Sequence, residues 1–185
     1  MGGPAVVAVL AGGRSRRMGA AKAVVPFAGE PLIARPLAAA AAAGLEAVVV
    51  AKPSSELPPL GVPVWFEPEA PRHPLAGLVR ALESGRPVVA VACDMPFLAP
   101  GLLSHLAALE SPAAAAPGEP FPGRYEPSVL PVLRDALARE APMRGALAAL
   151  APEEVDLSAF GDPARLVLSV NTPEELAAAL ASTRS

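Results

Sequence analysis

The fold class of this chain follows from residues 6–22, which read VVAVLAGGRSRRMGAAK. Val6 to Ala11 is a continuous apolar run rich in β-branched residues, and this pattern predicts a buried strand that ends at Gly12-Gly13. Glycines and basic side chains follow at once, a composition that suits a loop whose backbone N–H groups point at an anion. We therefore expect a phosphate-binding loop at the carboxyl end of the first strand, where open α/β sheets bind ligands.

This loop differs from two known phosphate-binding patterns. In a Walker A loop, Lys directly follows the second Gly, whereas Ala20 and Ala21 separate Gly19 from Lys22 here. The dinucleotide pattern GxGxxG is absent as well. The alternative is a basic surface loop that contains glycines without binding anything, but three glycines and four cations within thirteen residues favour a cradle for a triphosphate or pyrophosphate.

Strand and helix patterns alternate along the rest of the chain. Short apolar runs predict further strands over residues 47–51, 62–66, 88–93 and 166–170. Helical patterns cover residues 31–43, 74–84, 100–109, 129–139, 144–150 and 173–181. The Ala/Pro/Gly-rich stretch from Ser111 to Gly123 is predicted to be a mobile loop. Alternation with wholly apolar strands predicts an α/β fold, with a mostly parallel sheet and helices on both faces.

Length and composition limit the alternatives. A length of 185 residues predicts one domain spanning residues 1–185. A net charge of −3 argues against a nucleic-acid partner. The hydrophobic fraction of 52% is largely alanine, and the longest apolar stretch contains Gly44 and Glu46, so we expect no membrane partner and a cytoplasmic protein. A single cysteine excludes a disulfide framework and a zinc site built on cysteines.

Two carboxylates follow predicted strands at the edge where the glycine-rich loop lies. Asp94 stands at the tip of an apolar strand, where an ionised carboxylate needs a cationic partner. Beside a nucleotide that partner is Mg²⁺, which proteins bind through one or two carboxylates together with phosphates. A structural capping role for Asp94 is the alternative. Glu67 follows the third predicted strand and either serves the same region or is a solvated loop carboxylate.

The cysteine and the histidines do not suggest catalysis. Cys93 lies in an apolar strand without a histidine partner in the sequence, so we expect a small core residue. His73 precedes a predicted helix and His105 lies within one, and no third ligand accompanies them in the sequence, which argues against zinc.

Four motifs in order resemble a known family. Residues 10–22, Pro74-Leu-Ala-Gly77, Cys93-Asp-Met-Pro-Phe97 and Val170-Asn-Thr-Pro-Glu-Glu-Leu176 are similar to segments of the molybdenum cofactor guanylyltransferases (MobA). The first motif alone indicates only the wider nucleotidyltransferase superfamily. The four together span essentially the whole chain and are specific.

The resemblance implies a Rossmann-like fold and the transfer of GMP from GTP to the phosphate of molybdopterin, with Mg²⁺ and release of pyrophosphate. It implies GTP and molybdopterin or the molybdenum cofactor as partners, with transient contact with the proteins that donate or accept this cofactor. The nucleotide-binding residues are then Leu10, Ala11, Gly12, Gly13, Arg14, Lys22, Glu67 and Asp94. The catalytic residues are Lys22, Asp94 and Arg17; Asp94 is also the metal ligand, and Asn171 is on the pterin side.

Three positions depart from the family's usual pattern. Members often carry Asn just after the second strand, where this chain has Ala51-Lys52, and Asp after the third strand, where it has Glu67. The usual Gly before Pro-Leu-Ala-Gly is His73. These departures leave recognition of the base less well defined than phosphate binding.

Other functions remain open from the sequence. The cytidylyltransferase of the same pathway tends to read Leu-Ala-Ala-Gly in the first loop, and Gly12 favours a purine nucleotide instead. A sugar-phosphate or isoprenoid-alcohol-phosphate nucleotidyltransferase is a broader alternative. A non-catalytic nucleotide-binding regulator would keep the loop but lose the metal carboxylate, so Asp94 argues against it.

Overall fold

The computed structural model describes residues 3–12 and 21–183. Its main sheet has seven strands in the order β5-β4-β1-β6-β8-β7-β9. These strands are β1 (Val6–Leu10), β4 (Ala47–Ala51), β5 (Val64–Phe66), β6 (Val88–Ala92), β7 (Ala113–Ala115), β8 (Gly123–Tyr125) and β9 (Glu153–Glu154). A separate small hairpin is formed by β2 (Pro26–Phe27) and β3 (Glu30–Pro31).

The sheet is mostly parallel, as the sequence predicts. β1 lies at its centre between β4 and β6, and Val9 pairs with Val49 on one side and Val91 on the other. β5 continues the parallel set beyond β4. β8 is the exception, because it runs antiparallel to both β6 and β7. The carboxyl ends of β5, β4, β1 and β6 therefore meet along one edge of the sheet.

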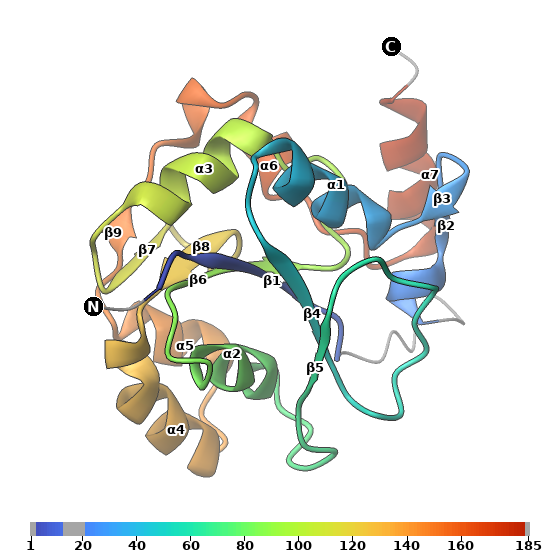
Figure 1. The fold of residues 1–185 in the computed structure, drawn as a ribbon. Coiled ribbons are helices and arrows are strands. Elements are labelled where there is room, and N and C mark those ends of the chain that lie inside the picture. The colour runs from blue at the N-terminus through green and yellow to red at the C-terminus, as the bar shows by residue number, and fades with distance from the viewer. Residues whose placement is uncertain (1–2, 13–20, 184–185) are drawn as a thin grey trace.

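Helices cover both faces of the sheet. They are α1 (Ala34–Ala42), α2 (Leu75–Leu82), α3 (Pro100–Ala108), α4 (Leu130–Ala138), α5 (Met143–Ala148), α6 (Pro163–Leu166) and α7 (Pro173–Ala181), joined by short 3₁₀ turns at Lys22–Val24, Pro127–Val129 and Leu157–Ala159. In Figure 1, α1, α3 and α6 lie on one side of the sheet, and α2, α4 and α5 lie on the other. α7 stands beside the β2–β3 hairpin. None of the helices within residues 3–12 and 21–183 has the length and apolarity needed to cross a bilayer.

Alternate residues of the central strand supply two cores. Val7 and Val9 belong to the core on the α1 and α3 side, whereas Val6 and Ala8 belong to the core under α2 and α4. Successive side chains of a strand point to opposite faces, so a strand that is apolar throughout feeds both cores at once. This is why the wholly apolar runs predicted buried parallel strands correctly.

One predicted loop is wrong in part. The Ser111–Gly123 stretch contains β7, whose three alanines are buried between β8 and β9. Alanine has low strand propensity, so the local sequence does not mark this strand. It forms because β8 offers an unpaired edge of the sheet, which only the folded chain creates.

One predicted strand is also wrong. Leu166 ends α6, and residues 167–170 form neither helix nor strand. The Asp162 side chain caps α6 by accepting a hydrogen bond from the backbone N–H of Ala164, which starts a short helix where the apolar run suggested a strand. The predicted helix over residues 31–43 begins only at Ala34, because Glu30 and Pro31 belong to the hairpin.

Candidate active site

A large cleft lies at the carboxyl edge of the parallel strands. Its volume is about 1070 Å³, which is large enough for a nucleotide. Residues from the ends of β1, β4, β5 and β6 line it together with segments near the C-terminus. The predicted site residues that line it are Leu10, Ala11, Gly12, Lys22, Glu67, Asp94 and Asn171. The other three, Gly13, Arg14 and Arg17, lie outside the described residues.

Lys22 joins two predicted site residues that are distant in sequence. Its Nζ donates one hydrogen bond to Oδ2 of Asp94 and another, of 2.6 Å, to Oδ1 of Asn171. All three residues line the cleft. The ammonium group of Lys22, from the first motif, therefore contacts both the Cys93-Asp-Met-Pro-Phe97 motif and the C-terminal motif.

The backbone holds this cluster in place. Asp94 lies two residues beyond the end of β6, and its carbonyl accepts a hydrogen bond of 2.9 Å from the N–H of Val170. Asn171 precedes the α7 capping box, and its own N–H donates to Oε2 of Glu175 at 2.6 Å. The chain after α6 thus runs alongside the end of β6 instead of entering the sheet.

The charge on Asp94 is only partly compensated. Its side chain is almost wholly buried, with the residue 6% exposed. Oδ2 is paired with Lys22, but Oδ1 has no hydrogen-bond partner among the described residues. A buried carboxylate oxygen without a partner is costly, so this oxygen is suited to bind a further cation. Within the described part of the chain, no cluster of three or more acidic, histidine or cysteine side chains could hold a metal ion.

A second carboxylate lies on the other side of β1. Glu67 follows β5 and is 4% exposed, and its Oε1 lies 3.4 Å from Nζ of Lys52, which follows β4. Burial raises the pKa of the Glu67 carboxyl above its usual range, and the charge of Lys52 acts in the opposite direction. Lys52 also donates a 2.6 Å hydrogen bond to the carbonyl of Pro68. Glu67 is thus an ion-paired, buried carboxylate rather than a solvated one.

Two glycines make room for Glu67. A Cβ atom on Gly12 would lie 1.9 Å from Oε1 of Glu67, and one on Gly77 would lie 3.3 Å from Oε2. The first distance is far below van der Waals contact. A side chain at position 12 would therefore force the Glu67 carboxylate to shift from its place beside the end of β1.

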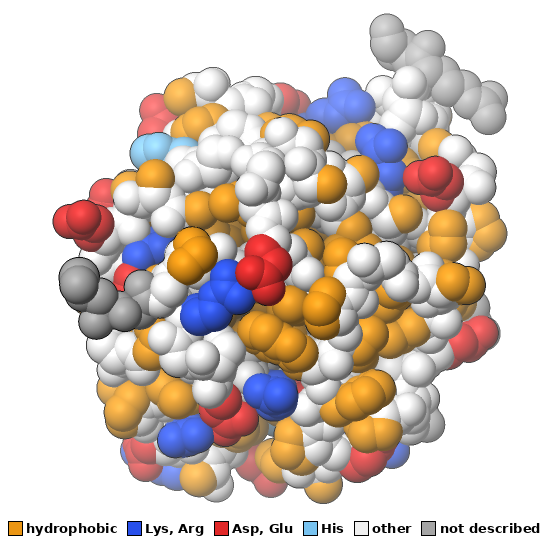
Figure 2. Space-filling view, in the orientation of Figure 1, with side chains coloured by type: hydrophobic (Ala, Val, Ile, Leu, Met, Phe, Trp, Pro, Cys, Tyr) orange, Lys and Arg blue, Asp and Glu red, His pale blue; other side chains and the backbone are white. Residues whose placement is uncertain are grey.

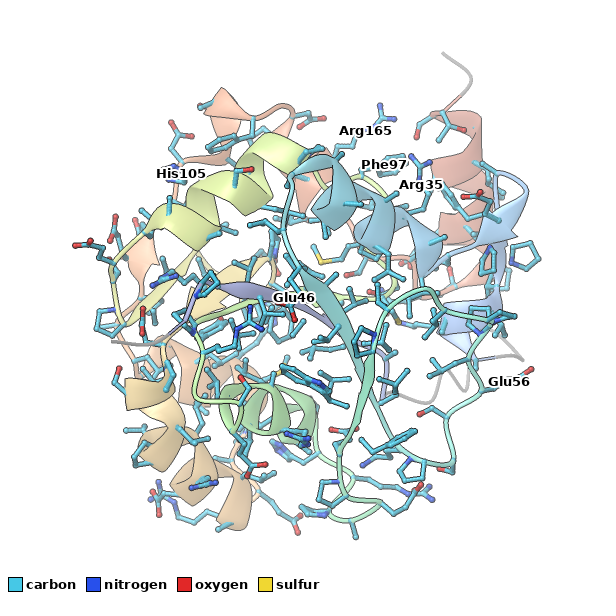
Figure 3. The ribbon with its side chains drawn as sticks, in the orientation of Figure 1. Arg35, Glu46, Glu56, Phe97, His105 and Arg165 are labelled. Atoms are coloured by element: carbon cyan, nitrogen blue, oxygen red, sulfur yellow. The ribbon has the colours of Figure 1, made fainter. Side chains whose placement is uncertain are left out.

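The cysteine and histidines occupy different environments. Burial raises the pKa of the Cys93 thiol to about 12, and the neighbouring Asp94 charge adds to this, so Cys93 is an inert core residue as expected. His105 lies on α3 (Figure 3). Its ring packs against that of Phe160, with 5.2 Å between ring centroids. His73 lines the cleft, and its Nδ1 accepts a 3.2 Å hydrogen bond from the N–H of Leu75 at the start of α2.

Sequence reasoning missed several residues of the cleft. In the sequence, Lys52 stands out only as a departure from a family pattern and as one of two lysines in the chain. The cleft is also lined by Phe121, Met143 and Arg144, which come from segments without a recognisable motif. Arg144 donates hydrogen bonds to the Gly118 carbonyl and to Glu119.

Comparison with known proteins assigns the family. Residues 7–155 match the model of the MobA-like NTP transferase domain. The chain belongs to this family. It is 36% identical over 191 residues to the molybdenum cofactor guanylyltransferase of Rhodobacter capsulatus, covering 92% of each chain. The match confirms the resemblance that the four motifs indicated, and with it a nucleotidyltransferase.

Solved structures confirm the fold of this MobA-like transferase. The molybdopterin-guanine dinucleotide biosynthesis protein A of Archaeoglobus fulgidus superposes with a TM-score of 0.80 at 24% identity, covering 97% of this chain and 98% of that one. A cytidylyltransferase from Thermus thermophilus superposes over all of both chains with a TM-score of 0.67 at 22% identity. Because both share the fold, the fold alone does not select the base.

Proposed function

We propose that this protein, acting as one nucleotidyltransferase domain over residues 1–185, transfers GMP from GTP to the phosphate of molybdopterin and releases pyrophosphate. The observation that carries the proposal is the contact of Lys22 with both Asp94 and Asn171 in the cleft. It brings the proposed nucleotide side, represented by Lys22 and Asp94, against the proposed pterin side, represented by Asn171. The name of the Rhodobacter capsulatus relative supports the same reaction.

The reaction needs little acid–base chemistry from the protein. The second ionisation of a phosphate monoester has a pKa of about 6, so the nucleophilic oxygen is already anionic near neutral pH. This oxygen forms a bond to the α-phosphorus of GTP as the bond to the bridging oxygen of pyrophosphate breaks. The protein then has to position both phosphates and neutralise their charge. The cluster of Lys22, Asp94 and Asn171 has the chemistry for this task.

Lys22 is proposed to hold the transferred phosphate. Its ammonium group is a compact cation whose two present acceptors, on Asp94 and Asn171, can share it with an incoming phosphate oxygen. Leu10, Ala11, Gly12 and Gly13 are proposed to contact the nucleotide with their backbone, and Arg14 and Arg17 to supply further positive charge. Glu67 is proposed to contact the nucleotide from the β5 side of the cleft.

The Asp94 site fits a magnesium ion. Its buried Oδ1 has no hydrogen-bond partner among the described residues, and its neighbourhood would include the phosphates of a bound nucleotide. Mg²⁺ prefers such a mixed set of one or two carboxylates, phosphates and waters over an all-protein cage. When bound there, the ion neutralises charge that develops on the leaving pyrophosphate. Asp94 would hold and orient the ion, and Lys22 would hold the Asp94 side chain in place.

Calorimetric titration with GTP, CTP and ATP in the presence of Mg²⁺ tests the proposal. We expect GTP to bind most tightly, because glycines at positions 12 and 13 carry no side chains that would hinder the approach of a large base. Pyrophosphate release with molybdopterin as acceptor should follow the same order. Tighter binding of CTP would assign the protein to cytidylyl transfer. Nucleotide binding without pyrophosphate release would instead indicate a regulator.

A further inference from the structure

A third, smaller core lies apart from the two cores of the main sheet. Its buried members are Phe27, Leu32, Val170 and Ala179, and Phe97 is a partly buried neighbour that packs against them. Phe27 belongs to the β2–β3 hairpin and Ala179 to α7. This small core therefore joins the hairpin, the segment after β6 and the C-terminal helix.

The three residues of the cluster around Lys22 come from the segments that the small core joins. Each lies within five positions of a residue in that core: Lys22 precedes Phe27, Asp94 precedes Phe97, and Asn171 follows Val170. The rings of Phe27 and Phe97 meet edge to face, with 6.0 Å between their centroids. Packing in the small core therefore affects where the Lys22 ammonium group meets its two acceptors.

One side chain links the small core to both ends of the segment that carries Asn171. Arg165 belongs to α6, and its guanidinium carbon lies 4.2 Å from the centroid of the Phe97 ring (Figure 3). Its Nη2 donates a 3.2 Å hydrogen bond to the carbonyl of Ser182, the residue that caps the end of α7. A cation at the C-terminal end of a helix also offsets the negative end of the helix dipole. Arg165 thus braces α6, Phe97 and the far end of α7.

The backbone that leads to Asn171 is irregular and depends on such support. Residues 167–170 form neither helix nor strand, and three of these four residues are partly or largely exposed. The N–H of Val170 bonds to the Asp94 carbonyl at 2.9 Å, and the Asn171 Nδ2 donates to the Ser169 carbonyl at 3.1 Å. An exposed stretch without a strand ladder opens more readily than the sheet, so its position depends on what holds its ends.

We propose that Arg165 is a positioning residue that keeps Asn171 in contact with Lys22. It acts from outside the cleft, through its stack on Phe97 and its hydrogen bond to the end of α7. A cation–ring contact and a hydrogen bond to a carbonyl together shift an equilibrium by about 5- to 30-fold. Loss of the Arg165 side chain should therefore increase opening of the Asn171 segment by that factor. The consequence for catalysis rests on the proposed function, in which Asn171 lies on the acceptor side.

The first test follows the exchange of backbone amide protons by NMR and does not depend on the reaction. The compared proteins are the wild type, Arg165→Met, Arg165→Lys and Arg35→Met. In Arg165→Met we expect the N–H of Val170 to exchange about 5- to 30-fold faster, while the amides of α4, on the other side of the sheet, keep their rates. Arg165→Lys keeps a cation at this position and should restore part of the protection.

Arg35 offers a matched control in the same small core. Its guanidinium carbon lies 5.8 Å from the centroid of the Phe27 ring, and its Nε donates to the Pro96 carbonyl at 3.4 Å. These two contacts involve neither α6 nor α7, so Arg35→Met should leave the exchange of the Val170 amide unchanged. An unchanged Val170 rate in Arg165→Met, or an equal rise in both methionine variants, would overturn the proposal.

The second test measures turnover of molybdopterin with GTP. In Arg165→Met we expect kcat/KM for the acceptor to fall by about 5- to 30-fold, because displacement of a group that positions a substrate slows the reaction. The affinity for GTP should stay within about twofold of the wild type. In an Asn171→Ala background the same change should have no further effect, because Arg165 acts through Asn171. An equal fall in both backgrounds would show that Arg165 only supports the fold, and would overturn the proposal.

The exchange experiment also separates the role of Arg165 from the proposed function. If the wild type transfers nothing from GTP to molybdopterin, the proposed function is wrong, but the Val170 amide still decides whether Arg165 holds this segment. If Arg165→Met does not fold, Phe97→Leu removes the same stack while keeping an apolar side chain. Faster exchange of the Val170 amide in Phe97→Leu would support the proposal, and an unchanged rate would overturn it.

Discussion

At the scale of single residues, the charge balance of the site rests on two lysines, each paired with one buried carboxylate. Lys22 neutralises part of Asp94 and orients Asn171, and Lys52 does the same for Glu67 on the other side of β1. These are the only two lysines in the chain. Loss of either lysine would leave a buried carboxylate without its cation, which loss of an exposed arginine would not do.

Lys22→Ala should weaken GTP binding by about 10- to 150-fold, because one charge-assisted contact to a phosphate contributes roughly 1.5–3 kcal/mol. We expect the variant to remain folded, since Asp94 also keeps its backbone contact to Val170. Calorimetry and circular dichroism of the same sample measure both properties. Arg139→Ala, at an exposed ion pair on α4, serves as the control, and unchanged GTP affinity in folded Lys22→Ala would contradict the assignment.

Asp94→Asn should lower turnover by orders of magnitude, with excess Mg²⁺ restoring only part of it. The change keeps the shape of the side chain but removes the charge that holds the proposed metal and balances Lys22. Pyrophosphate release at a series of Mg²⁺ concentrations measures this, and Asp135→Asn at an exposed position provides the comparison. A variant that unfolds while its folded fraction keeps full specific activity would show that Asp94 is a structural cap.

At the scale of elements, helix ends place the functional side chains. The C-terminal motif Val170-Asn-Thr-Pro-Glu-Glu-Leu176 combines Asn171 with the capping box of α7, in which Thr172 accepts from the N–H of Glu175. Oε2 of Glu175 accepts in return from the N–H groups of Asn171 and Thr172. The motif thus starts a helix and aims a site residue in one turn. On the other face of the sheet, Nδ1 of His73 accepts a hydrogen bond from the N–H of Leu75 at the start of α2.

Thr172→Ala should lower the free energy of unfolding by about 1 kcal/mol, the usual contribution of a threonine cap. It should also weaken binding of the pterin substrate, because Asn171 loses its neighbouring support. Urea denaturation followed by circular dichroism measures the first effect. Glu174→Ala in the same exposed first turn is the control. If both variants unfold at the same urea concentration as the wild type, the capping box contributes nothing to stability.

At the scale of the whole molecule, the cleft joins parts of the chain that are far apart in sequence. Its walls come from the loops after four parallel strands and from segments that begin at Glu119. On the face drawn in Figure 2, basic and acidic side chains are scattered among each other. Away from the cleft, Arg165 stacks 4.2 Å from the centroid of the Phe97 ring, and Arg35 lies nearby (Figure 3). Because residues from Leu10 to Asn171 line the cleft, a ligand bound there should contact both early and late segments of the chain.

A nucleotide that bridges these parts should stabilise the entire fold. Mg²⁺ and GTP at about 100 times the dissociation constant contribute roughly 2.7 kcal/mol to the free energy of unfolding. For a chain of this size, that free energy corresponds to a rise in Tm of about 5–11 °C. Differential scanning calorimetry measures the shift, and ATP at the same concentration is the comparison. An equal shift with both nucleotides would contradict selective binding of the guanine base.

The patterns that the sequence alone settles are those with a local physical cause. A run of β-branched apolar residues is buried wherever it lies, so β1, β4 and β6 were predicted almost to the residue. Gly44 ends α1 in a left-handed conformation with φ of 69°, as its position after an alanine helix predicted. The edge at which Leu10, Lys22 and Asp94 meet also followed, because parallel strands bring their carboxyl ends together.

Tertiary structure decided the rest, because the remaining features depend on partners distant in the chain. Three alanines form the strand β7 because β8 offers them an edge for pairing. The apolar run that ends at Val170 does not join the sheet, and the Val170 N–H bonds to the Asp94 carbonyl instead. The sequence showed Lys52 and Glu67 as two separate departures from a family pattern. Only the adjacency of β4 and β5 turns them into one buried ion pair, since two residues fifteen positions apart acquire a shared environment through folding.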